Sequence, residues 1–123
     1  MVKINLESLG IKKPVELKVT NLVVEKVTEA NIAVAKSYDM DGKDDMTIMQ
    51  ENLEATKAKK KILKDVLGLT AKQIKKIEED VPAFDLQVWF NDFATTVFTV
   101  AKLGMTLDEF NKQQENEPAH TAE

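Results

Sequence analysis

The sequence of 123 residues contains no cysteine and no arginine, and only four glycines, three prolines and one histidine. Without cysteine there is no disulfide framework, no thiolate metal site and no cysteine nucleophile. Because arginine supplies the planar, forked donor that reads bases and phosphates, its absence argues against a dedicated nucleic-acid reader. So few glycines leave no glycine-rich loop that could cradle a phosphate.

The inventory of catalytic groups is equally short. The only histidine, His120, falls in a polar C-terminal stretch, with no cysteine and no fixed aspartate beside it to orient the ring. A pair of nucleophile and base therefore has nowhere to form. The carboxylates are scattered, and nothing selects two of them as an acid–base pair. We predict a protein that is not an enzyme, with no catalytic residue, no metal and no cofactor.

Long hydrophobic runs are absent as well. No window approaches the ~18 apolar residues that a membrane-spanning helix requires. The N-terminal residues MVKINLESLG lack the basic region and apolar run of a signal peptide. We expect a soluble cytoplasmic protein without a membrane partner.

The aromatic residues, in contrast, are concentrated in one place. Residues 82–103, PAFDLQVWFNDFATTVFTVAKL, hold four of the five phenylalanines and the only tryptophan. Aromatic side chains bury the most apolar area, so this segment is predicted to be the central helix of the core. On a 3.6-residue period its apolar residues form one stripe, made of Leu86, Phe90, Phe93, Val97 and Val100 and widened by Trp89 and Ala101.

The ends of this segment carry cap signals. Asp80 and Pro82 stand where an N-terminal cap and a first-turn proline belong, and Gly104 stands where a C-terminal cap belongs. The β-branched residues among 95–100 would also suit a strand, so helix and strand both stay open there.

The rest of the chain predicts a small sheet and further helices. Residues 2–7 and 15–20 alternate apolar and polar residues, which predicts an N-terminal β-hairpin. A helical period follows over residues 22–38, 47–67 and 70–79. The predicted apolar face of the first of these helices consists of Val23, Val27, Ala30 and Val34, and that of the second of Ile48, Ala55, Ala58, Ile62 and Val66, broadened by Leu63 and Leu67.

Local signals also mark where these helices begin and end. Thr47 and Thr70 each precede a glutamine by three residues, which predicts two capping boxes, and Gly68 is predicted to end the helix over 47–67. The fold class is therefore mainly α (α+β), with four to five helices around a central aromatic helix and a small N-terminal β-hairpin. We expect residues 1–112 to form a single globular domain and residues 113–123 to be a disordered polar tail.

An acidic loop at residues 39–45, DMDGKDD, is the nearest approach to a metal motif. Counted from Ser37, the loop places Asp39, Asp41, Gly42 and Asp45 at positions 3, 5, 6 and 9 of a calcium loop. Position 1 should be aspartate and is serine, and position 12 should be a bidentate glutamate and is Ile48. We interpret the segment as a solvated turn.

A lysine-rich patch could contact phosphates or an acidic partner, and consists of Lys57, Lys59, Lys60, Lys61, Lys64, Lys72, Lys75 and Lys76. It contains no arginine and no aromatic residue, so an outward, solvated helix face is the favoured interpretation. The phrase LGLTAKQIKKI is typical of a helix-turn-helix DNA reader. The segment that would then be the recognition helix, DVPAFDLQVWF, is too apolar to lie in a DNA groove.

Charge divides the chain into two parts. Residues 1–76 carry 15 lysines and 11 acids, whereas residues 77–123 carry 2 lysines and 10 acids. This asymmetry could favour head-to-tail self-association, or it could simply form two solvated faces of one domain. For contact with another protein, the best candidates are Met105, Leu107 and Phe110, in a short helix predicted to follow Gly104. The alternative is that these three pack back on the central helix.

As a whole the sequence resembles the small tail assembly chaperones of long-tailed bacteriophages and prophages, especially those of low-GC Gram-positive hosts. The resemblance comes from the opening strands VKINLE and VELKVT, the helices around FDLQVWFNDFATTVFTVAKLG, the acidic overall charge, lysine without arginine, and the polar tail QQENEPAHTAE. It implies a non-enzymatic protein that coats the tape measure protein, keeps it soluble and helps recruit tail-tube subunits. It also implies that ribosomal frameshifting can produce a longer second product.

Two other functions stay open on the sequence alone. One is a structural component of the same particle, such as a head-to-tail connector that forms a fixed ring. The other is a helix-turn-helix DNA-binding regulator. A ring of defined copy number would indicate the connector, and salt-sensitive DNA binding would indicate the regulator.

Overall fold

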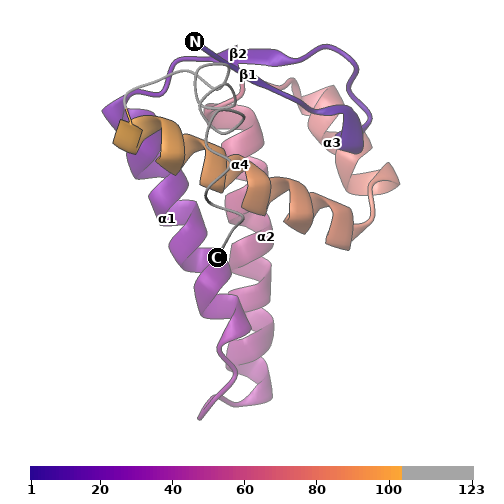
Figure 1. The fold of residues 1–123 in the computed structure, drawn as a ribbon. Helices are drawn as coiled ribbons and strands as arrows, with labels where there is room; N and C mark the ends of the chain where they lie inside the picture. The colour runs from indigo at the N-terminus through magenta and orange to yellow at the C-terminus, as the bar shows by residue number, and fades with distance from the viewer. Residues whose placement is uncertain (104–123) are drawn as a thin grey trace, which may run out of the picture.

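The structure, a computed structural model, describes residues 1–103. Over that range the elements are, in order, β1 (Val2–Ile4), the 3-10 turn η1 (Glu7–Leu9), β2 (Val15–Leu17), α1 (Asn21–Tyr38), α2 (Asp45–Asp65), α3 (Ala71–Asp80) and α4 (Ala83–Leu103). Figure 1 shows α1 and α2 side by side as a long antiparallel arm, with α4 running across its upper half and the hairpin over its upper end. The predicted fold class, mainly α with a small N-terminal hairpin, is confirmed.

The hairpin forms where the alternation predicts it. β1 and β2 pair antiparallel, with Val2 opposite Leu17 and Ile4 opposite Val15. The inward residues Val2, Ile4 and Leu17 are buried, because a two-stranded sheet is stable only with one face against a core. Each strand is three residues long, shorter than predicted, since the chain turns into η1 directly after β1.

Two of the predicted helix boundaries are confirmed in detail. Thr70 and Gln73 form the predicted capping box at the start of α3, in which the Gln73 backbone N–H donates to Thr70 Oγ1 at 3.1 Å and the Thr70 N–H donates to Gln73 Oε1 at 2.9 Å. Gly68 follows α2 with a φ of +68°, a conformation that favours glycine. Its N–H donates to the carbonyl of Lys64 and so closes the last turn.

Two predicted caps are wrong. The predicted start of α2 at Thr47 is late, because Asp44 caps the helix and accepts the Thr47 backbone N–H at 2.8 Å on Oδ1. An aspartate three residues upstream thus takes the cap position and adds residues to the first turn. Asp80 is the last residue of α3 and caps nothing at the start of α4. The carbonyl of Pro82 accepts the Leu86 N–H there, so Pro82 lies just before α4 instead of within it.

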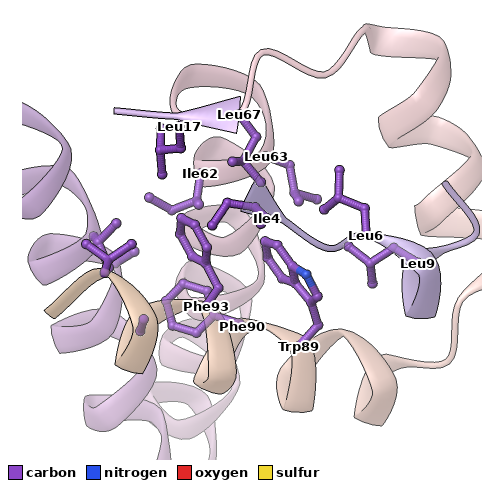
Figure 2. Close-up of a cluster of buried hydrophobic side chains, with 14 of the residues drawn as sticks. Ile4, Leu6, Leu9, Leu17, Ile62, Leu63, Leu67, Trp89, Phe90 and Phe93 are labelled. Atoms are coloured by element: carbon purple, nitrogen blue, oxygen red, sulfur yellow. The ribbon is translucent and has the colours of Figure 1, made fainter. Parts of the chain in front are cut away.

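α4 is the centre of the core, as the aromatic segment predicts. Figure 2 shows Trp89, Phe90 and Phe93 pointing from α4 toward side chains of the hairpin and of α2. Residues 95–100 are helical, because Val97 and Val100 fall on the same buried stripe and packing outweighs their β propensity. The predicted burial of Ala101 is wrong: it is exposed, since cover over α4 ends at Val100 within the described range.

Candidate functional site

The three residues predicted to contact a partner, Met105, Leu107 and Phe110, lie outside the described residues, as does His120. The capped short helix predicted after Gly104 and the tail predicted over 113–123 lie outside them too.

The acidic loop uses its carboxylates to hold its own backbone. Asp39 Oδ1 accepts the Asp41 N–H at 3.2 Å, Asp44 caps α2, and Asp45 is already in that helix. Hydrogen bonding from the Thr47 side chain, and then from its backbone, lowers the pKa of Asp44 below its usual 3.8. Among residues 1–103 no three acidic or histidine side chains are gathered so that they could hold a metal ion.

The lysine-rich patch is not one continuous surface. The prediction that Lys59 points outward is wrong: its side chain is buried between α2 and α4, and its Nζ donates to Gln87 Oε1 at 2.7 Å. Burial lowers the pKa of Lys59, because the charged form loses solvation. Lys60 faces Glu78 of α3, with Nζ 3.5 Å from Oε2, so part of the positive charge already has a carboxylate nearby.

The segment that would be a DNA recognition helix is part of the core. It forms the first half of α4, where Trp89 and Phe90 are buried in the core. A helix in that position cannot present this face to a DNA groove, so the structure does not support the DNA-reading interpretation.

The candidate site is an open groove between β1, η1 and the first half of α4, which we call the α4 groove. It has a volume of about 520 Å³. Its walls are formed by residues of β1 and η1 on one side and of α4 on the other, namely Lys3, Ile4, Asn5, Glu7, Ser8, Phe84, Asp85, Val88, Trp89, Asp92, Phe93 and Thr96.

The base of the α4 groove is closely packed. The rings of Trp89 and Phe93 stack with centroids 5.1 Å apart and planes 6° from parallel, and both are buried. The indole Nε1–H of Trp89 donates to the backbone carbonyl of Asn5 at 2.9 Å. This bond joins α4 to the residue that follows β1, across 84 residues of sequence, and so connects the two walls of the groove.

Above that base the groove presents exposed apolar side chains. Phe84 is 75% exposed and Val88 is 42% exposed, one helical turn apart on α4. The rim carries the carboxylates of Glu7, Asp85 and Asp92 against the single ammonium of Lys3. An apolar floor with a mostly acidic rim fits a peptide segment that has apolar residues flanked by basic ones.

The apolar stripe predicted from the sequence does not include Phe84 and Val88. A signal was present, because both lie on the side of the predicted helix opposite Phe90 and Val97. Packing of the hydrophobic core does not require an apolar pair on the outward face of a helix. What the sequence could not reveal is that β1 and η1 rise beside that pair and make a groove.

No helix in the part of the chain that the structure describes is long and apolar enough to cross a membrane. Comparison with known families gives one finding: a family model described as "Phage tail assembly chaperone proteins, TAC" matches residues 2–117. No curated protein and no solved structure matches the sequence.

Proposed function

The chain belongs to the phage tail assembly chaperone family, which is non-enzymatic, and on that premise we propose that its α4 groove holds apolar, basic segments of the tape measure protein. The observation that supports this proposal is the exposed pair Phe84 and Val88, which lines the same groove as the stacked, buried rings of Trp89 and Phe93. In this role the protein works in the cytoplasm of the host cell, keeps the tape measure protein soluble and helps recruit tail-tube subunits.

The size of the groove suits a reversible holder. Burying an exposed phenylalanine contributes about 1.5–3 kcal/mol, far less than a permanent interface requires. Repetition over many copies along a long client raises the total strength, while each contact can still be displaced when the tube forms. The acidic rim then selects segments with lysine or arginine beside the apolar residues.

Co-expression with the tape measure protein of the same genome tests this. The fraction of tape measure protein in the soluble lysate is measured with the wild-type chain and with Phe84→Ser, and we expect it to fall several-fold for the variant. Ile32→Ser is the matched control, since Ile32 is 59% exposed on α1 and does not line the groove. Equal solubility with both variants would exclude the α4 groove as the client site.

The family resemblance also leads us to propose a longer product made by frameshifting. Mass spectrometry of all products translated from the native gene with its downstream DNA tests this directly. A minor species that shares this N-terminus and extends past Glu123 is the expected result. The absence of such a species would refute the proposal of a second product and would not affect the proposal that the α4 groove holds the tape measure protein.

A further inference from the structure

α2 has a second face, opposite to the one that packs in the core. Its buried residues include Ala55, Ile62 and Leu63, which face the hairpin and the other helices. On the opposite side Met46, Met49 and Leu53 follow at steps of three and four residues, and are 60%, 57% and 54% exposed. Steps of three and four put side chains on one line along a helix, so these three form a single apolar strip.

The same line continues as a row of lysines. From Leu53, steps of four, three and four residues lead to Lys57, Lys60 and Lys64. We call the six residues of this line the α2 stripe. At 1.5 Å per residue it is about 27 Å long, with an apolar first half and a cationic second half.

The cationic half is available for a new carboxylate partner. Lys57, Lys60 and Lys64 line a shallow groove of about 360 Å³ between α2 and α3. The only ion pair that the structure describes there joins Lys60 to Glu78 at 3.5 Å, with the two side chains 34% and 46% exposed. Exposed pairs of this kind contribute little, so Lys60 can exchange Glu78 for another acid at small cost.

A ligand for the α2 stripe must carry apolar residues followed by acids, and this chain contains such a segment. Met105, Leu107 and Phe110 come first, with Asp108 and Glu109 between the last two, and Glu115 and Glu117 follow. Residues 104–123 hold five acids and one lysine, a net charge of −4 with His120 neutral. From residue 105 to residue 117 the chain spans between about 18 Å as a helix and about 40 Å when extended, which brackets the length of the stripe.

We propose that residues 105–117 of one copy bind the α2 stripe of a second copy. The apolar residues of the segment cover Met46, Met49 and Leu53, and its acids face the three lysines. Attachment to the same copy is disfavoured by where α4 ends: its last turn lies at the upper part of α1 (Figure 1), whereas the first turn of α2, which holds Met46, is at the lower end of the arm.

An interface between two different surfaces of the same chain does not close on itself as a twofold dimer does. Each copy offers one segment and one stripe, so copies add head to tail. The α2 stripe and the α4 groove share no residue. Self-association is therefore independent of the client site proposed above, and either proposal can fail alone.

Charge reversal in the full-length protein tests the proposal by sedimentation velocity over a range of concentrations. We expect concentration-dependent oligomers for the wild type, weakened by added salt. Glu115→Lys with Glu117→Lys should weaken association about tenfold or more, as should Lys57→Glu with Lys64→Glu. Combining all four changes should restore association to within about threefold of the wild type, because the attraction is re-formed with its signs exchanged.

The matched control is Lys12→Glu with Lys13→Glu, which changes net charge equally on exposed residues of the hairpin loop. This control should leave association unchanged, and far-UV circular dichroism should show that all variants keep the helical fold. Wild-type protein that stays monomeric at every concentration would overturn the proposal. So would either reversal without effect, or a fourfold variant that associates no better than the two double variants.

Discussion

Replacing Phe93 with alanine is expected to lower the free energy of unfolding by about 3–5 kcal/mol. The Phe93 ring is 3% exposed and stacks on Trp89, so truncation leaves a cavity and removes an aromatic pair that contributes about 0.5–1.5 kcal/mol beyond its buried area. The loss should therefore fall in the upper half of the range. For a domain of this size it corresponds to a decrease in melting temperature of roughly 15–23 °C.

The control for this change is the same substitution on the same helix. Phe84→Ala removes an equal number of atoms from a side chain that is 75% exposed, and should cost less than about 0.5 kcal/mol. Urea unfolding followed by far-UV circular dichroism measures both, because the fluorescence of Trp89 is itself altered by the loss of Phe93. A loss below about 1 kcal/mol for Phe93→Ala, or equal losses for the two variants, would refute α4 as the centre of the core.

Four further changes test the fold. Hydrogen bonds from Thr47 hold the pKa of Asp44 below 3.8, so the contribution of Asp44 to stability is present above pH 3.8 and is lost as the pH falls through the lowered pKa. Asparagine can still cap the helix but does not titrate, so Asp44→Asn should remove this part of the acid dependence of the urea midpoint. Burial lowers the pKa of Lys59, so the free energy of unfolding of the wild type should rise as the pH rises toward 10.5 and the buried ammonium loses its proton. The free energy of unfolding of Lys59→Met should rise less over the same pH range, measured by the same urea titration. Gly68→Ala should lower the free energy of unfolding by about 1–2 kcal/mol in urea unfolding, because alanine is strained at a φ of +68°. No atom lies within 4 Å of the added Cβ, so a steric clash does not contribute, and a neutral result would contradict strain at this turn. Deleting residues 113–123 should leave the melting temperature of the monomer within about 2 °C, and loss of cooperative melting would make the tail part of the domain.

Much of the fold could be predicted because its signals are local. Residues 22–38 and 82–103 each keep one apolar face over several turns, and Thr70 with Gln73 marks a helix start that needs no tertiary information. The error at the start of α2 arose because two local signals compete. Asp44 and Thr47 can both cap a helix, and the upstream residue did so.

Other features depend on contacts between distant residues, which local patterns do not contain. Lys59 looks like any other lysine of its run, and its burial depends on Gln87, 28 residues away, accepting its hydrogen bond. The α4 groove depends on the bond between Trp89 and the carbonyl of Asn5, which no periodicity indicates. The exposed pair Phe84 and Val88 was visible as an outward apolar face, but its neighbours were not.

Site-specific photo-crosslinking tests the central claim, that the α4 groove holds the tape measure protein, most directly. A photoreactive phenylalanine analogue is placed at position 84 in the groove, or at the exposed control position 32 on α1, during co-expression with the tape measure protein. We predict a strong cross-link to the tape measure protein from position 84 and little or none from position 32. Equal yields from the two positions, or a cross-link from position 32 alone, would contradict the account.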